Sequence, residues 1–171
     1  MKKICFVFQA RGLNARGRMT WNLLPKAHIR QVDHLTTIKV LLADDHPGFP
    51  GFVANLLEST FEVVGRVADG RSLFEAAMEL KPDVIITDIC MPVLNGLEAA
   101  DLLRKSGCTA KIVFLSVHSE PDFVQAGLSA GALAYVVKPR VGTELLLAIR
   151  EVLAGKTFVS PGLSREDSSK L

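Results

Sequence analysis

Three aspartates stand at the ends of two apolar runs and could do chemistry together. Asp44 and Asp45 directly follow the run 38–43, and Asp88 closes the run 84–87. A short apolar run that ends in an acid is typical of a buried parallel strand whose carboxyl end opens into a crevice. Three carboxylates in one crevice repel one another unless a cation joins them, and hard oxygen ligands suit Mg²⁺, which usually takes phosphate oxygens as further ligands. The pattern therefore indicates metal-assisted phosphoryl chemistry.

A hydroxyl and an ammonium group follow the next two apolar runs. Ser116 comes after the run 111–115, and Lys138 comes after the run 134–137. A phosphoryl group on a carboxylate needs its oxygens neutralised, and these two donors are suited to that task. A single aspartate at a strand end is often only the N-cap of the next helix, but capping does not account for three of them. Five polar residues at successive strand ends favour one shared site.

These motifs resemble the receiver domain of bacterial two-component response regulators. The resemblance covers about residues 38 to 160, and each motif stands in receiver order and at receiver spacing. The motifs are Asp44-Asp45, Asp88-Ile89-Cys90-Met91-Pro92 with Gly96, Ser116, and Lys138-Pro139. The segments 44–47 and 154–161 further resemble the receivers of the LuxR (NarL-like) transcription factors.

The resemblance implies a role for each site residue. Asp88 is the expected phosphoacceptor, which takes a phosphoryl group from a histidine kinase. Asp44, Asp45, Asp88 and the backbone carbonyl of Cys90 are the expected Mg²⁺ ligands. Ser116 and Lys138 are expected to bind phosphoryl oxygens, Ser116 and Tyr135 to form the switch, and the bond before Pro139 to be cis. A receiver is not a conventional enzyme, although it can catalyse its own phosphotransfer and dephosphorylation.

Apolar segments alternate between strand and helix patterns from residue 38 onward. The predicted strands lie near 38–43, 62–68, 83–87, 111–115 and 132–137, and the predicted helices near 48–58, 70–80, 94–105, 121–129 and 142–154. The predicted fold is therefore α/β and flavodoxin-like, a doubly wound five-stranded parallel sheet with strand order 2-1-3-4-5 and helices on both faces. One feature departs from the family pattern: Pro47, Gly48, Pro50 and Gly51 cluster where the first helix should begin, so a late start and a weaker Mg²⁺ site are expected.

The ends of the chain differ from its centre. Residues 1–37 hold seven basic residues and one acidic residue, which leaves 13 basic and 17 acidic residues for the rest. Composition favours a disordered basic extension over 1–37, with a nucleic-acid contact, a membrane contact or a misassigned translation start as open alternatives. LuxR-type receivers continue into a helix-turn-helix, whereas 161–171 reads as a tail or truncated linker. We therefore expect a receiver without its output domain, either truncated or a natural stand-alone protein, and no direct DNA binding by this chain.

Composition limits the cellular context and leaves three functions open. Cys5, Cys90 and Cys108 form no disulfide framework, and no apolar run is long enough for a membrane span, so a cytoplasmic protein without a membrane partner is expected. The leading hypothesis is a phosphoacceptor receiver in a two-component system that regulates transcription. Its expected partners are a histidine kinase, a second copy of the chain, and an output domain or downstream regulator. The alternatives are a degenerate receiver that acts as a phosphorylation-independent interaction module and a Mg²⁺-dependent aspartate-nucleophile phosphatase, although that phosphatase class has a second aspartate at the position of Cys90.

Overall fold

The computed structural model describes residues 8–13, 19–23 and 37–163, and the chain divides into two units, Met1–Thr36 and Thr37–Leu171. In the first unit, β1 (Phe8–Leu13) pairs with β2 (Met19–Leu23) in antiparallel fashion, with a register shift between Ala10 and Gly12. The sequence predicts no strand there, because glycine and asparagine interrupt any period. The rest of the extension over 1–37 for which we predicted disorder lies outside the described residues.

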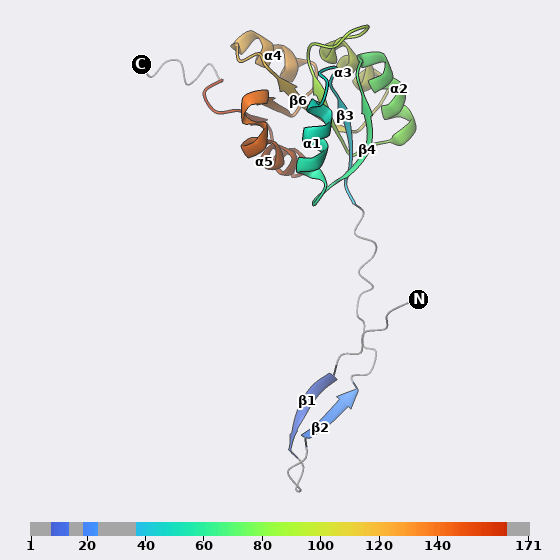
Figure 1. The fold of residues 1–171 in the computed structure, drawn as a ribbon, viewed down its shortest axis with the longest axis vertical. Helices are drawn as coiled ribbons and strands as arrows, with labels where there is room; N and C mark the ends of the chain where they lie inside the picture. The colour runs from blue at the N-terminus through green and yellow to red at the C-terminus, as the bar shows by residue number, and fades with distance from the viewer. Residues whose placement is uncertain (1–7, 14–18, 24–36, 164–171) are drawn as a thin grey trace. The chain divides into compact units, whose positions relative to one another are not determined.

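The second unit is built on one parallel sheet of six strands, shown in Figure 1. The strand order is β4-β3-β5-β6-β7-β8. The strands are β3 (Lys39–Ala43), β4 (Glu62–Val67), β5 (Val84–Asp88), β6 (Lys111–Ser116), β7 (Ala134–Val137) and β8 (Phe158–Val159). The five predicted strands and their relative order are confirmed, whereas the predicted total of five is wrong. The sixth strand, β8, has only two residues, which is too short to produce a period in the sequence.

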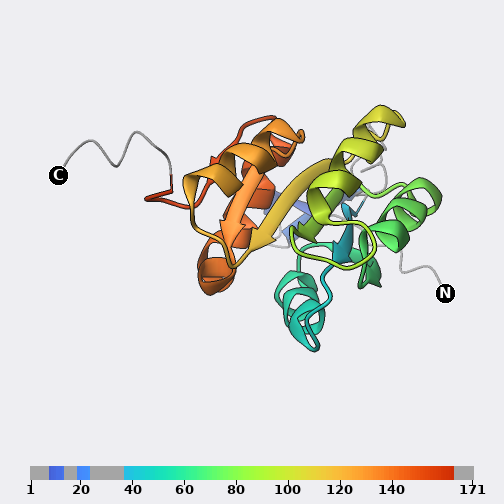
Figure 2. The same ribbon diagram turned by 90° about the horizontal axis from the view of Figure 1, so that it is seen from above.

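Helices cover both faces of this sheet, as Figure 2 shows from above. They are α1 (Phe49–Leu57), α2 (Gly70–Leu80), α3 (Gly96–Lys105), α4 (Pro121–Ser129) and α5 (Val141–Leu153), with a 3₁₀ turn η1 (Lys138–Arg140) before α5. One core cluster joins α1 and α5 to one face of the sheet, and a second joins α2, α3 and α4 to the other. Alternate residues of each strand enter opposite clusters, as in Val40 and Leu41, because successive side chains of a strand point to opposite faces. No helix in the described ranges is both long enough and apolar enough to cross a bilayer.

The first helix begins just after the Pro47-Gly48 pair. Gly48 is its N-cap and has a φ of 83°, a left-handed conformation that glycine adopts at little cost. Phe49 and Pro50 then occupy the first turn, where the missing N–H of proline does no harm. By contrast, α2 and α3 begin at side-chain caps, since Asp69 accepts from the Ser72 N–H and Asn95 forms a capping box with Glu98. The cluster of Pro and Gly therefore sets the entry of α1 without preventing the helix.

The last strand is held against the sheet by a buried serine. Ser160 donates its backbone N–H to Tyr135 O at 2.9 Å, and its hydroxyl accepts the Val137 N–H at 3.1 Å and donates to the Glu144 carboxylate. Arg140 of η1 donates to Pro161 O at 2.7 Å. These bonds tie residues 158–161 to β7 and to the start of α5. Of the segment 161–171, residues 164–171 lie outside the described part of the chain.

Candidate functional site

Strand register brings the predicted aspartates to one edge of the sheet. β3 lies between β4 and β5, and Ala43 pairs with Thr87, so Asp44 and Asp88 leave neighbouring strands at the same level. The chain crosses from one side of β3 to the other at this point, which is where open α/β sheets form ligand crevices. Asp44 and Asp88 are buried, with 6% and 2% of their surface exposed, while Asp45 is exposed. Two carboxylates are thus removed from solvent beside a third that remains in contact with it.

The ammonium group of Lys138 lies between the two buried carboxylates. Its Nζ is 2.6 Å from Asp88 Oδ2 and 2.7 Å from Asp44 Oδ2, and only 8% of the lysine side chain is exposed. Burial opposes the positive charge, but the hydrogen bonds to Asp44 and Asp88 outweigh it, so the pKa of Lys138 is raised above its usual value. Lys138 is therefore fully charged at neutral pH and balances part of the negative charge of the cluster.

His46 adds an imidazole nitrogen to the same cluster. His46 Nδ1 lies 3.2 Å from Asp44 Oδ1, 3.2 Å from Asp45 Oδ1 and 3.7 Å from Asp88 Oδ2. Its backbone N–H also donates to Asp44 Oδ1 at 2.9 Å, which fixes the turn after β3. The sequence predicts no separate role for His46, although it directly follows the acidic pair. A histidine next to two strand-end aspartates is the signal that could have found it.

The aromatic ring of Phe49 lies against Lys138. Lys138 Nζ is 4.7 Å from the centroid of the Phe49 ring, within the range of a cation–π contact. Phe49 is the first residue of α1 and also packs against the core cluster of α1 and α5. An aromatic residue at the start of a helix carries no sequence signal for this contact, because the contact joins parts of the chain that are far apart in sequence.

Ser116 ends β6, the neighbour of β5, and Tyr135 lies on β7, the next strand along the sheet. Ser116 is fully buried, ends β6 one residue beyond the pair Asp88↔Leu115, and pairs with Val137, the residue before Lys138. Its hydroxyl accepts the His118 N–H at 3.1 Å. Tyr135 is fully buried, and its hydroxyl donates a hydrogen bond to His118 O at 2.9 Å. Burial raises the pKa of that hydroxyl. The predicted switch pair is thus linked through one loop residue, His118.

Cys90 stands at the mouth of the site. Its backbone N–H donates to Asp88 Oδ1 at 3.3 Å, and its thiol lies 3.5 Å from His118 Nε2. The His118 ring stacks on the Phe123 ring with 4.0 Å between the centroids, and this contact fixes the orientation of the imidazole. Burial and the negative charges of Asp88 and Asp45 raise the pKa of the Cys90 thiol, which is therefore protonated at neutral pH.

The predicted cis bond before Pro139 is absent. All peptide bonds of the described residues, including Lys138–Pro139, are trans. Pro139 lies inside the 3₁₀ turn Lys138–Arg140, which Val137 enters in extended conformation with φ −80° and ψ 134°. The fixed φ of proline suits the first turn of a helix without a cis bond. The prediction of a cis-proline is therefore wrong for this structure.

A tight turn closes the loop after Asp88. Val93 has a φ of 67°, and the Leu94 N–H donates to Pro92 O at 2.8 Å across it, which is the pattern of a γ-turn. A left-handed conformation is strained for a β-branched residue. The Gly96 N–H then donates to Ile89 O at 2.8 Å, which brings the start of α3 against the strand end that carries Asp88.

Gly96 leaves no room for a side chain at this contact. A Cβ on Gly96 would lie 2.0 Å from Asp88 O, which no structure tolerates without movement. We expect Gly96→Ala to displace the backbone of Asp88 and to lower the free energy of unfolding by about 2 kcal/mol, the usual cost of overpacking. Urea unfolding measures this loss. Gly142→Ala is the matched control, because a Cβ there meets nothing within 4 Å, and equal losses in the two variants would contradict the close contact at Asp88.

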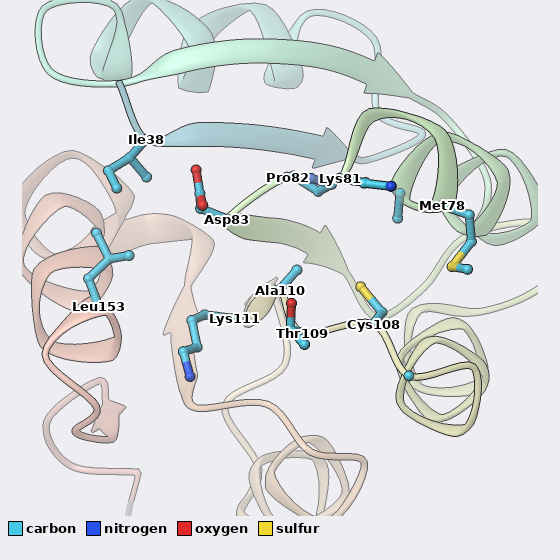
Figure 3. A pocket seen from close by; sticks show the side chains of 12 residues that line it. Ile38, Met78, Lys81, Pro82, Asp83, Cys108, Thr109, Ala110, Lys111 and Leu153 are labelled. Carbon is cyan, nitrogen blue, oxygen red and sulfur yellow. The ribbon is translucent and has the colours of Figure 1, made fainter. Parts of the chain in front are cut away.

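A separate hollow lies at the opposite ends of the strands. Its volume is about 400 Å³, and Figure 3 shows the residues that line it, among them Ile38, Asp83 and Lys111 near the starts of β3, β5 and β6. Asp83 accepts the Lys39 N–H at 2.8 Å and so joins two strand starts. None of the predicted site residues lines this hollow. The chemistry expected from the sequence therefore belongs to the carboxyl edge of the sheet.

The residues at the carboxyl edge fit a hard divalent cation. Ligand atoms of Asp44, Asp45, His46 and Asp88 all lie within 4.8 Å of one another. Asp44 Oδ2 is buried, and among the described residues its charge is balanced by the ammonium group of Lys138 at 2.7 Å. A set dominated by carboxylate oxygens is typical of Mg²⁺ sites. The donor chemistry is thus that of an acidic pocket built mainly from carboxylate oxygens.

A family model and curated relatives match the second unit of the chain. The model of the response regulator receiver domain family matches residues 40–150. The chain is 36% identical over 131 residues to the response regulator GacA of Pseudomonas aeruginosa, covering 75% of this chain and 61% of that protein. It is 35% identical over 127 residues to the nitrate/nitrite response regulator protein NarL of Escherichia coli K12, covering 73% and 59%. The chain thus spans less than two thirds of these two curated relatives.

A solved structure of a response regulator has a similar fold. The crystal structure of a LuxR family two-component response regulator from Aurantimonas sp. SI85-9A1 superposes with a TM-score of 0.73 at 30% identity, covering 79% of this chain and 98% of that one. The parallel sheet of this chain, with helices on both of its faces, is flavodoxin-like. From the family match and these relatives, the chain belongs to the receiver domain family of two-component response regulators and has homologues of the NarL and LuxR type.

Proposed function

We propose that this chain accepts a phosphoryl group on Asp88 from the phosphohistidine of a histidine kinase and thereby changes its association with other proteins in transcriptional regulation. An oxygen of the Asp88 carboxylate attacks phosphorus, the bond from phosphorus to the histidine nitrogen breaks, and the nitrogen keeps the electron pair. The observation that carries the proposal is the buried Asp88 carboxylate 2.6 Å from Lys138 Nζ at the end of a central strand. A nucleophile with a fixed cation beside it suits phosphoryl transfer.

Four groups of this chain have roles in the metal site that we propose. Asp44, Asp45, Asp88 and the backbone carbonyl of Cys90 would hold Mg²⁺, and the cluster of carboxylate oxygens within 4.8 Å supports the first three. When bound, the ion supplies charge neutralisation for the carboxylates and the phosphoryl oxygens. Lys138 and Ser116 bind the remaining phosphoryl oxygens through an ammonium and a hydroxyl group.

The proposed switch uses contacts around His118. Ser116 accepts the His118 N–H, and Tyr135 donates to His118 O, so the serine hydroxyl and the tyrosine ring share one loop. If Ser116 turns toward a phosphoryl oxygen, its bond to the His118 N–H is lost and the loop between β6 and α4 is free to shift. The buried position of Tyr135 supports a coupling of that loop to the strand β7.

Self-association is the output that we propose for this unit. On α1 and α5, which pack together on one face of the sheet, Phe52 and Leu147 are 51% and 50% exposed. Large apolar side chains on two adjacent helices suit an interface with a second copy of the chain. Association through the face of α4, β7 and α5 is the second candidate, because the Tyr135 switch lies next to it.

One experiment tests both phosphorylation and association. The purified chain is incubated with acetyl phosphate with and without Mg²⁺, and intact mass and elution volume are measured on the same sample. We expect one phosphoryl group per chain, only with Mg²⁺, together with elution at a larger size. Leu147→Glu should keep the mass gain and lose the change in elution, because it affects only the proposed interface.

Two experimental outcomes would contradict this function and support a different one. If neither acetyl phosphate nor beryllofluoride modifies a folded chain, the acidic pocket is idle and the protein acts as a phosphorylation-independent interaction module. If the chain instead releases phosphate from phosphate esters with sustained turnover, it is an aspartate-nucleophile phosphatase. Cys90 disfavours the phosphatase, because its pKa is raised by burial and it offers no carboxylate as general acid at that position.

A further inference from the structure

The turn Pro47-Gly48-Phe49 has a structural effect that helix capping does not explain. At Gly48 the helix α1 lacks the side-chain cap that Asp69 and Asn95 provide for α2 and α3. A Cβ on Gly48 would meet nothing within 4 Å, so the glycine is required by its φ of 83° and not by lack of space. The turn thus lacks a side-chain cap, but it places Phe49 at the first position of α1, where its ring lies against the Lys138 ammonium.

Four groups surround the Lys138 ammonium, and one of them differs in kind. Lys138 Nζ lies 2.6 Å from Asp88 Oδ2, 2.7 Å from Asp44 Oδ2 and 3.3 Å from His46 Nδ1, and 4.7 Å from the centroid of the Phe49 ring. The first three partners belong to the acidic cluster, and their interactions with lysine change when a cation or a phosphoryl group joins that cluster. The attraction of the Phe49 ring for a cation depends only on its quadrupole and stays the same.

A lysine needs such a constant partner in order to act as a preorganised charge. Its ammonium is a compact charge on a flexible stem of four carbons, which loses rotamer freedom when it is held in one place. Electrostatic stabilisation of phosphoryl transfer depends on donors that are already in position. We propose that Phe49 is a positioning residue for Lys138: its ring holds the ammonium next to Asp88 while the carboxylates exchange partners during phosphorylation. This inference rests on the proposed function, since it deepens the role of Lys138 in it.

Core packing is the competing explanation for Phe49. The residue is partly buried, packs against the core cluster of α1 and α5, and has its ring 6.2 Å from that of Phe52. Leucine would preserve much of this packing but has no aromatic face, whereas tryptophan keeps an aromatic face and has the stronger attraction for a cation. The two substitutions therefore separate the electrostatic role from the packing role.

The test combines labelling rates with a spectroscopic signature. Rates of labelling by acetyl phosphate at fixed Mg²⁺ are compared for the wild type, Phe49→Leu and Phe49→Trp, with far-ultraviolet circular dichroism as the check on folding. We expect about a fivefold loss for Phe49→Leu, which is less than the full strength of a desolvated cation–π contact because the carboxylates still hold the ammonium group, and a rate within about twofold of the wild type for Phe49→Trp. Phe74→Leu is the matched control, because Phe74 is also a half-buried phenylalanine on a helix but packs against the core cluster on the other face of the sheet, and it should label at the wild-type rate.

Nuclear magnetic resonance then reports the contact itself. The methylene protons next to Lys138 Nζ lie over an aromatic face and should show an upfield ring-current shift in the wild type, which Phe49→Leu removes and Phe49→Trp keeps. Equal losses of rate for the two variants, an unchanged rate for Phe49→Leu, or an unshifted lysine resonance in the wild type would each overturn the proposal. If the wild type is not labelled at all, the proposed function fails, while the resonance of the wild type still decides whether Phe49 holds Lys138.

Discussion

Asp88→Asn should abolish labelling by acetyl phosphate while the protein stays folded. The substitution removes the proposed nucleophile but preserves the shape of the side chain. The amide oxygen can still accept the Cys90 N–H, which bonds to Asp88 Oδ1 at 3.3 Å. Labelling should fall to the level of a sample without acetyl phosphate. Asp44, the other described carboxylate that is buried and contacts Lys138, directly follows the neighbouring strand β3 and is proposed as a metal ligand. Intact mass under mild conditions measures the result.

Asp83→Asn is the matched control for this substitution. Asp83 directly precedes β5, the same strand that Asp88 ends, and its carboxylate accepts the Lys39 N–H at the far edge of the sheet. The variant should label at the wild-type rate. Undiminished labelling of Asp88→Asn would remove Asp88 from the role of phosphoacceptor, and labelling of the Asp88→Asn variant at a new position would point to Asp44 as the reactive group.

Lys138→Met should weaken both the fold and the chemistry. The substitution keeps an unbranched side chain of similar length but leaves Asp44 and Asp88 buried without their ammonium partner. Removal of one member of a buried ion pair costs about 3 kcal/mol in the free energy of unfolding, and loss of a preorganised cation should slow labelling by about a hundredfold. Urea unfolding and labelling by acetyl phosphate measure the two effects. Addition of Mg²⁺ should reduce the difference in the free energy of unfolding between the wild type and Lys138→Met, because we propose that the ion binds the same carboxylates.

The pH dependence of that difference follows from the raised pKa of Lys138. Burial alone would lower the pKa of Lys138, but the hydrogen bonds to Asp44 and Asp88 raise it by a larger amount. The pKa of Lys138 is therefore higher in the folded state than in the unfolded state. The stability due to this charge is therefore fully present below the ordinary pKa of lysine, about 10.4, and is lost only as the pH rises through the folded value. The stability difference between the wild type and Lys138→Met should stay constant through neutral pH and decrease only in strong alkali.

Lys156→Met is the matched control for the lysine. Lys156 Nζ lies 3.1 Å from Glu151 Oε2, but its side chain is 68% exposed. Exposed ion pairs contribute little, so this variant should lose less than about 1 kcal/mol and label normally. Equal losses in the free energy of unfolding for Lys138→Met and Lys156→Met would show that burial does not increase the contribution of Lys138 to stability.

The fold was largely predictable because its pattern is local. Each buried strand is a short apolar run, each helix carries an apolar stripe, and their alternation leads to a parallel sheet. The boundaries of α2 and α4 agree with the prediction, 70–80 and 121–129. The exceptions are elements without a local pattern. Strand β8 has two residues and is held by Ser160, whose partners Tyr135, Val137 and Glu144 are distant in sequence.

The sequence by itself determined which groups could meet: Asp44, Asp45, Asp88, Ser116 and Lys138 each follow an apolar run, and parallel strands bring such ends to one edge of the sheet. Only the tertiary structure decided how they meet. It placed Lys138 between the carboxylates of Asp44 and Asp88, and it placed His46 beside the carboxylates of all three aspartates. It also placed the Phe49 ring over the Lys138 ammonium and made the bond before Pro139 trans. The physical reason is that strand ends are set by local hydrophobic pattern, whereas side-chain contacts between residues far apart in the chain depend on strand register, on the direction in which each helix begins, and on the balance of buried charge.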